Sequence, residues 1–145
     1  MIIMRKCLII YDTKSGNTKI LTKMLHQSLE SMEISVKTIQ DKKLKDLRAI
    51  ATYDIIGVGS PVHMNSLAFT LRRKLKNIAK KKIDLKGKKL ITFSTSKFPL
   101  KWEIANNKAV DLLKSTGIEH FATFGCQERP SDEFSGIIQD KLKGI

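Results

Sequence analysis

Residues 11–18 read Tyr-Asp-Thr-Lys-Ser-Gly-Asn-Thr, and this stretch decides how the chain on either side of it folds. The apolar run at 7–10 that precedes it is typical of a buried parallel strand. After it, apolar residues recur at helical spacing from Ile20 to Met32, so a helix begins near Asn17. A strand-to-helix turn of small hydroxyl residues around one glycine presents backbone N–H groups and O–H donors at the positive end of a helix. The sequence therefore predicts a phosphate-binding loop.

Better-known phosphate loops do not fit these residues. A nucleoside triphosphate loop needs Gly-x4-Gly-Lys-Ser/Thr and a dinucleotide fold needs three spaced glycines, whereas this stretch has Gly16 alone. A cysteine phosphatase needs its nucleophile at the head of the loop, but Cys7 lies at the start of the strand.

The composition is typical of one globular domain over residues 1–145, with 41% hydrophobic and 28% charged residues. The longest apolar runs are about five residues, far too short to span a membrane. Residues 1–6 lead into the first strand without the pattern of a signal peptide, so we expect a cytoplasmic protein. Cys7 and Cys126 fit no metal-ligand spacing and no redox pair, and are expected to be unpaired core residues.

The rest of the chain alternates strand patterns with helical ones. A polar helix or turn is expected at 43–51, and Ser66 is expected to cap the helix that follows the third strand. This alternation predicts an α/β fold with a doubly wound, five-stranded parallel sheet and helices on both faces. After the first strand and helix, strands are expected at 33–39, 54–59, 89–94 and 118–126, and helices at 67–78, 105–113 and 131–142.

Two stretches resemble the flavodoxin family. Residues 13–18, Thr-Lys-Ser-Gly-Asn-Thr, are similar to the loop that binds the FMN phosphate in that family. Residues 53–62, Tyr-Asp-Ile-Ile-Gly-Val-Gly-Ser-Pro-Val, look like the segment that leads to its second flavin loop. The resemblance covers nearly the whole chain and implies strand order 2-1-3-4-5, with FMN bound at the switch point between the first and third strands. A phosphoacceptor receiver domain shares this order but needs a carboxylate after the third strand, which here ends Gly-Ser-Pro.

The resemblance implies that three loops hold FMN at the carboxyl edge of the sheet. The first binds the phosphate through hydroxyls and backbone amides, and its glycine permits the tight turn. The second and third border the flavin ring. The expected cofactor residues are Thr13, Lys14, Ser15, Gly16, Asn17 and Thr18 in the first loop, Ser60, Pro61, Val62, His63, Met64 and Asn65 in the second, and Thr95, Ser96, Lys97 and Trp102 in the third.

The second and third loops depart from the family pattern. Many members have glycine where Asn65 stands, and asparagine is the next most tolerant residue for positive φ. Members often stack a tyrosine on the outer ring face, whereas here Phe98 and Trp102 are available, and Trp102 could equally pack against the sheet. Lys97 and Lys101 bring positive charge, so anionic reduced FMN is disfavoured less than in an acidic site.

The leading functional hypothesis is an FMN-binding electron carrier that shuttles electrons between protein partners, with the redox chemistry supplied by FMN and no catalytic or metal-binding residues. The first alternative is a flavodoxin-like FMN oxidoreductase resembling menaquinone-dependent protoporphyrinogen oxidase. The second is a flavin-free module that binds anions or nucleic acid.

The net charge of +13 predicts attraction to an acidic molecule. We expect the redox partners to be acidic proteins and expect no specific nucleic acid. Ten lysines and arginines between Arg72 and Lys89 stand against Asp84 alone. This run is expected to lie mostly away from the flavin edge, either as a solvated face or as a non-specific anion-binding surface.

Overall fold

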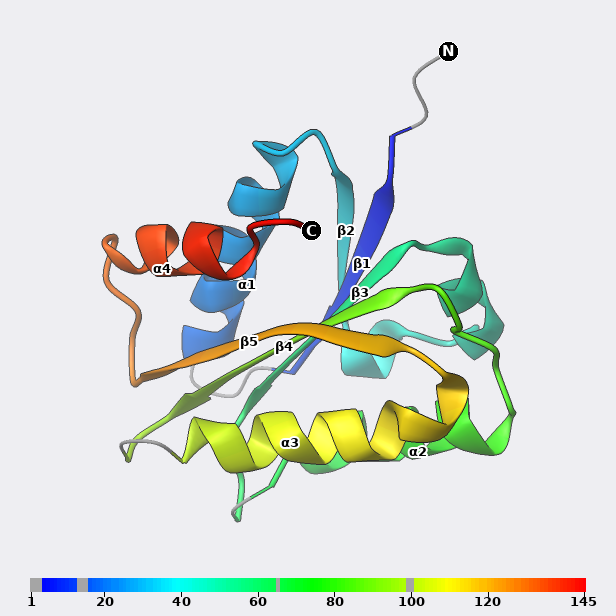
Figure 1. Ribbon diagram of the computed structural model, residues 1–145. Helices are drawn as coiled ribbons and strands as arrows, with labels where there is room; N and C mark the ends of the chain where they lie inside the picture. The colour runs from blue at the N-terminus through cyan, green and yellow to red at the C-terminus, as the bar shows by residue number, and fades with distance from the viewer. Residues whose placement is uncertain (1–3, 13–15, 65, 99–100) are drawn as a thin grey trace.

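Five parallel strands form the centre of the computed structural model, which describes residues 4–12, 16–64, 66–98 and 101–145 (Figure 1). Their order is β2-β1-β3-β4-β5, so the predicted fold class and strand order are confirmed. The strands are β1 Lys6–Tyr11, β2 Ser35–Gln40, β3 Ile55–Pro61, β4 Lys89–Ser96 and β5 Glu119–Gln127.

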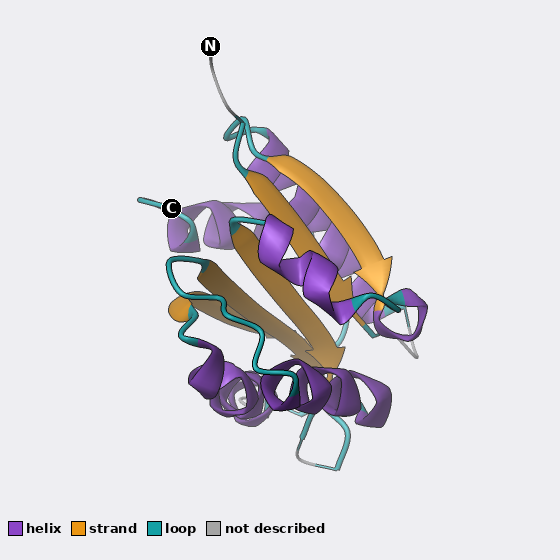
Figure 2. Cartoon of the chain, turned by 90° about the vertical axis from the view of Figure 1, so that its right-hand side faces the viewer, coloured by secondary structure: helices purple, strands orange, loops and turns teal. Residues whose placement is uncertain are grey.

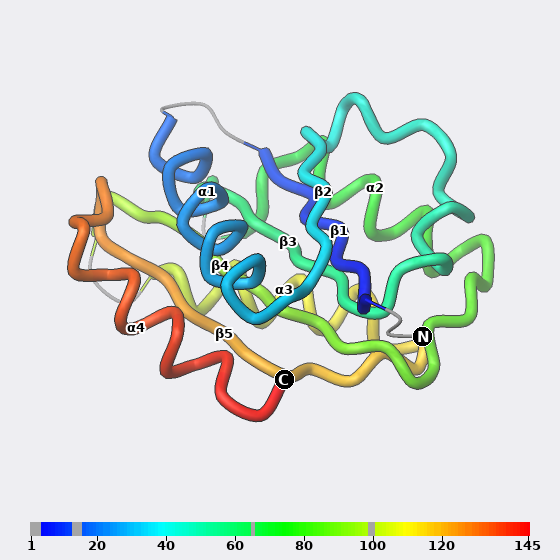
Figure 3. Tube along the Cα trace, turned by 90° about the horizontal axis from the view of Figure 1, so that it is seen from above, coloured from blue at the N-terminus to red at the C-terminus, as the bar shows by residue number. Residues whose placement is uncertain are grey.

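Helices cover both faces of the sheet. Figures 1 and 3 show α1 and α4 on one face, with α2 and α3 on the other, and Figure 2 shows the strands lying between these layers. Within the described residues, no helix combines the length and apolar character needed to cross a membrane. The helices are α1 Asn17–Glu30, α2 Phe69–Lys80, α3 Trp102–Leu113 and α4 Phe134–Lys141, and the short 3₁₀ helices are η1 Asp41–Lys43, η2 Leu47–Thr52 and η3 Lys114–Thr116.

The core has two parts, one on each face of the sheet. Alternate residues of β1 point to opposite faces, so Leu8 and Ile10 pack under α2 and α3 while Ile9 packs under α1. Each fully buried leucine or isoleucine contributes roughly 1.5–3 kcal/mol of stabilisation. The edge strand β2 is only half-buried, as its alternation of polar and apolar residues predicts.

The strand register sets the carboxyl edge of the sheet. Tyr11 at the end of β1 pairs with Gly59 of β3, and Pro61 at the end of β3 pairs with Thr95 of β4. The loops that follow these strands therefore lie side by side. The chain's last residue lies at the opposite edge, where its carbonyl accepts hydrogen bonds from Arg5 and Lys89.

The start of α2 differs from the prediction. Ser66 does not cap this helix, because its backbone N–H and C=O both pair with His63 in a tight turn. The next two residues bury their side chains, and the helix begins only at Phe69, after Ala68. Residues 66–68 close the loop before the helix, so α2 starts three residues after Ser66.

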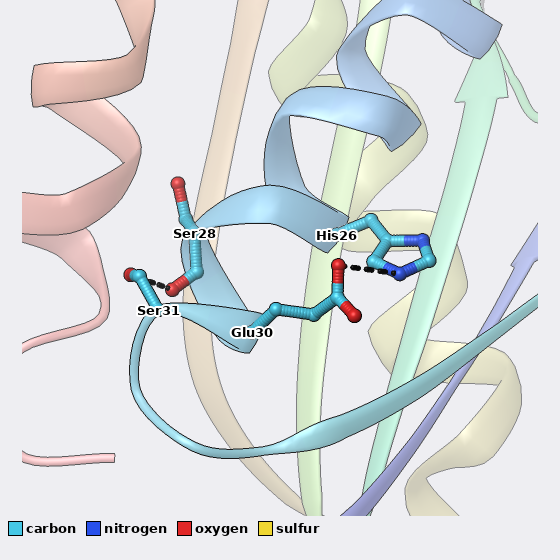
Figure 4. A network of polar contacts seen from close by, with 4 residues as sticks. All are labelled: His26, Ser28, Glu30 and Ser31. Carbon is cyan, nitrogen blue, oxygen red and sulfur yellow. Dashed lines mark hydrogen bonds and ion pairs between the residues drawn. The ribbon is translucent and has the colours of Figure 1, made fainter.

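The C-terminal end of α1 is held by local polar contacts (Figure 4). The Ser31 hydroxyl donates to the Ser28 carbonyl at 2.6 Å, which accounts for one carbonyl that has no partner inside the helix. His26 and Glu30 lie one turn apart with 3.0 Å between imidazole nitrogen and carboxylate oxygen.

Both cysteines lie in the core below α1 and α4, as expected. Cys7 is on β1 and Cys126 is on β5, which are not neighbours. Burial raises the pKa of the Cys7 thiol to about 12 and that of Cys126 to about 11. Neither thiol is poised as a nucleophile.

A glycine in β3 makes room for the largest core side chain. A Cβ atom at Gly59 would lie 2.2 Å from ring carbons of Phe93, which is fully buried and stacked on Phe124 at a centroid distance of 5.5 Å. Neither ring can move aside without disturbing the other.

Gly59→Ala is therefore expected to lower the free energy of unfolding by about 1–3 kcal/mol through overpacking. The matched control is Gly136→Ala in α4, where nothing lies within 4 Å of the added carbon. The control should raise the stability by about 0.5–1 kcal/mol, because alanine has the higher helix propensity. Urea unfolding of both variants measures the difference, and a Gly59→Ala variant as stable as the parent would contradict this packing.

Candidate functional site

A cavity of about 830 Å³ opens at the carboxyl edge of the sheet. Its lining comes from the start of α1, from the last residues of β3 and β4 and the loops after them, and from the residue that follows β5. The structure thus brings together residues expected from all three loops. The lining residues are Asn17, Pro61, Val62, His63, Met64, Thr95, Ser96, Lys97, Phe98, Lys101 and Glu128.

The first loop enters α1 through a left-handed residue. Gly16 has φ +90° and precedes the helix as its N-cap, so this position favours glycine. The first turn of α1 contains no aspartate or glutamate, which leaves the positive end of the helix dipole without a nearby side-chain anion from that turn. Asn17 reaches the cavity. The expected ligands Thr13, Lys14 and Ser15 lie outside the described residues.

Three of the expected cofactor residues form hydrogen bonds within the protein at this edge of the sheet. The hydroxyls of Thr18 and Thr95 lie 2.9 Å apart and are buried, which joins the start of α1 to the end of β4. Ser60 is fully buried, and its Oγ accepts from the Ala68 N–H and donates to the Pro61 carbonyl. Of these three hydroxyl residues, Thr95 lines the cavity as well.

The second loop folds as a tight turn. Its base is tied to β4, since the Val62 N–H donates to the Thr95 carbonyl at 2.9 Å. His63 and Ser66 then exchange two backbone hydrogen bonds. Met64 at the tip has φ +48° and is 88% exposed, so an unbranched but non-glycine residue takes a left-handed conformation. Asn65, for which positive φ was considered, lies outside the described residues.

The third loop is held by β5. Glu128 donates its N–H to the Ser96 carbonyl at 2.7 Å, and the Gln127 amide donates to the Lys97 carbonyl. Phe98 donates its N–H to the Ser96 hydroxyl and leaves 66% of its side chain exposed at the cavity. Lys97 and Lys101 both line the cavity.

Glu128 is a cavity residue that the sequence reasoning missed. It follows β5, which ends at the same edge as β4. The strand order expected from the sequence could have identified it, because the residues that follow neighbouring parallel strands lie at the same edge of the sheet.

Trp102 packs against the sheet and does not line the cavity. A Cβ atom at Gly125 would lie 2.3 Å from the indole ring, so the ring covers this glycine of β5 where α3 begins. Among the described residues, Phe98 lines the cavity and supplies a phenyl ring there.

A pair of carboxyl groups follows β1 and β2. Asp41 is buried, its Oδ1 accepts the Lys42 N–H, and its Oδ2 has no hydrogen-bond partner among the described residues. Burial is the main cause that raises the pKa of Asp41 to about 7, and the nearby carboxylate charge of Asp12 raises it further. Asp41 therefore retains its proton below neutral pH beside the first loop.

Comparison with known proteins identifies relatives of the whole fold. A family model described as a flavodoxin domain matches residues 8–127. The flavodoxin of Aquifex aeolicus (strain VF5) is 33% identical over 73 residues, which are 48% of this chain and 38% of that protein. The matched part is thus well under half of that relative's length.

Solved structures show the same fold. Oxidised Flavodoxin 1 from Bacillus cereus has a TM-score of 0.82 at 21% identity, over 97% of this chain and 99% of that one. Rubredoxin oxygen:oxidoreductase from Desulfovibrio gigas has a TM-score of 0.81 at 18% identity, over 94% of this chain and 34% of that one. At these identities the likeness concerns the fold alone.

The left-handed tip of the second loop gives a stability prediction. Met64→Gly should raise the free energy of unfolding by up to about 1 kcal/mol, because glycine takes positive φ without strain and the exposed side chain contributes little packing. Met64→Val should lower it by about 1 kcal/mol, because a branched Cβ tolerates this conformation worst. Chemical denaturation compares the two; equal stabilities would mean that the backbone at this position carries no strain.

The buried carboxyl gives a pH dependence. Because the native state binds this proton more tightly than the unfolded chain does, the stabilisation is fully present below pH 4 and is lost as the pH rises through about 7. The loss is on the order of 4 kcal/mol, because each pKa unit between the native and the unfolded state corresponds to about 1.4 kcal/mol. Asp41→Asn should flatten the pH dependence of unfolding between pH 4 and 7, whereas Asp111→Asn on α3 should leave it as in the parent. An unchanged profile in Asp41→Asn would refute the assignment.

Proposed function

The chain belongs to the flavodoxin family, and we propose that it is an electron carrier that binds FMN in the cavity at the carboxyl edge and exchanges electrons with acidic protein partners. FMN is the cofactor of this family. The observation that supports the proposal best is a cavity that adjoins the start of α1 after Gly16, at the switch point of the strand order between β1 and β3.

The chemistry of the cavity fits FMN. Its volume of about 830 Å³ lies within the usual range for ligand sites. Pro61, Val62 and Phe98 offer apolar and aromatic surface for a flat ring. The helix start after Gly16 suits a phosphate group, since its N–H groups and dipole favour an anion.

Each group has a distinct task in this proposal. The first loop holds the phosphate through Thr13, Lys14, Ser15, Gly16 and Asn17. The second and third loops border the ring. Thr18 and Ser60 act as positioning residues, because their hydroxyls fix the start of α1 and the base of the second loop. Bound FMN supplies one- and two-electron chemistry, and the protein tunes it through Lys97, Lys101 and Glu128 at the cavity wall. The cytoplasmic location remains a prediction from the sequence.

The visible absorption spectrum of the purified protein, recorded before and after adding FMN, tests the proposal. Bands near roughly 375 and 450 nm that shift on binding are expected. FMN that remains free in solution would contradict the proposal. Sustained turnover of a quinone by the loaded protein would instead assign the chain to the FMN oxidoreductases.

The two cavity lysines should set the potential of bound FMN. Lys97→Ala and Lys101→Ala together are expected to lower the potential of the second one-electron reduction by about 20 mV per lysine, because each removes a charge that favours the anionic reduced flavin. The control pair Lys23→Ala and Lys141→Ala removes the same charge from α1 and α4. Redox titration distinguishes them, and equal potentials in both pairs would remove the electrostatic role of the cavity lysines.

A further inference from the structure

The positive charge of the protein is concentrated on one layer. Residues 41–48 and 69–88 contain thirteen lysines and arginines and three aspartates, one of which is the buried Asp41. The opposite layer, residues 17–30 and 128–145, contains five cations and five carboxylates. We call the first group the cationic layer; its members are Lys42, Lys43, Lys45, Arg48, Arg72, Arg73, Lys74, Lys76, Lys80, Lys81, Lys82, Lys86 and Lys88.

Two separate segments join to form the cationic layer. The ammonium group of Lys74 on α2 donates to the Leu44 carbonyl between η1 and η2 at 2.6 Å. Leu44 and Leu47 share one apolar core with Leu71 and Leu75 of α2. The charges of 41–48 therefore lie beside those of α2 on one surface, which the linear sequence does not show.

Ion pairs do not neutralise the charges of the cationic layer. Among the described residues, none of its members forms an ion pair, and the two ion pairs of the protein lie in the opposite layer, at His26–Glu30 (Figure 4) and Lys143–Asp140. Its positive field is therefore available to an acidic molecule.

One end of the cationic layer lies beside the cofactor cavity. Phe69 opens α2, is 56% exposed, and has the guanidinium of Arg73 at 4.8 Å and that of Arg72 at 5.8 Å from its ring centre. The Ala68 N–H to Ser60 Oγ bond fixes this helix start to the end of β3. At the same edge, η1 follows β2 and places Lys42 and Lys43 on the surface.

Exposed apolar side chains distinguish the cavity end of the cationic layer from its far end. Met64 and Phe98 project at the cavity and Phe69 at the start of α2. At the far end of the layer, residues 80–88, the exposed side chains are four lysines and Asp84, and the apolar Ile83 and Leu85 are buried. Aromatic residues, methionine and arginine are the side chains enriched in protein interfaces. A uniform polyanion such as a nucleic acid or an anionic bilayer does not require apolar groups at one end.

We propose that the cavity end of the cationic layer is the docking surface for an acidic electron-transfer protein, with carboxylates seated on Arg72 and Arg73 and its redox centre facing the cavity. This proposal rests on the proposed function. The solvated face expected from the sequence then applies to the far end of the layer alone, because Arg72 and Arg73 lie in the first turns of α2.

The test uses the FMN-loaded protein and a photoreduced, acidic plant-type [2Fe–2S] ferredoxin. In the step measured, one electron leaves the reduced cluster, which returns to its oxidised form, and enters oxidised FMN. The second-order rate constant is expected to fall at least about tenfold between roughly 10 and 300 mM salt. The variant Arg72→Glu/Arg73→Glu should lower the low-salt rate about tenfold.

The matched control Lys23→Glu/Lys141→Glu makes the same charge change on α1 and α4 and should stay within about twofold of the parent. Equal losses in both variants, or a rate that does not fall with salt, would overturn the proposal. Tighter salt-dependent binding of a DNA duplex or of anionic phosphatidylserine vesicles than of ferredoxin, abolished by Arg72→Glu/Arg73→Glu, would also overturn it.

A failure of the proposed function can be told apart from a failure of docking, because the absorption spectrum recorded before mixing shows whether FMN is bound. If it is not bound, docking is measured as calorimetric binding of oxidised ferredoxin. Binding that weakens about tenfold in Arg72→Glu/Arg73→Glu and not in the control supports the surface, and absence of binding contradicts it.

Discussion

The common direction of β1, β3 and β4 is the constraint on which the rest of the structure depends. Because these strands are parallel and in register, the turn before α1, the His63–Ser66 turn and the loop after Ser96 all lie at one edge. The hydrogen bond from Val62 to Thr95 and the contact between the Thr18 and Thr95 hydroxyls fix these loops to one another. The cavity is a consequence of strand direction, and its chemistry is a consequence of what each loop carries.

The sequence was most informative where short-range physics decides the structure. The apolar run before Tyr11 and the helical spacing after Asn17 predict β1 and α1, and Gly16 has the positive φ that its turn requires. The apolar segment 54–59 predicts a central strand, which β3 is. These features depend on periodicity and backbone conformation, both of which are readable from neighbouring residues.

The features that the sequence did not predict arise from tertiary contacts. Ser66 is a good capping residue, yet its backbone pairs with His63 and the helix starts later. The sequence left Trp102 between flavin contact and packing against the sheet, and the contact with Gly125, which is distant in sequence, decides for packing. Glu128 reaches the cavity because β5 ends beside β4. The charges of 41–48 join those of α2 through the Lys74–Leu44 hydrogen bond and the core that both segments share.

In the proposed electron carrier, the start of α1 binds the phosphate of FMN while the second and third loops hold the ring. The most direct test compares the dissociation constants of FMN and riboflavin, which share the ring and differ in the phosphate, by quenching of flavin fluorescence. The account predicts that FMN binds at least about 100-fold more tightly, since a phosphate at a helix start gains charge-assisted hydrogen bonds. Equal affinities would contradict it, because the loop after β1 would then contribute nothing to binding.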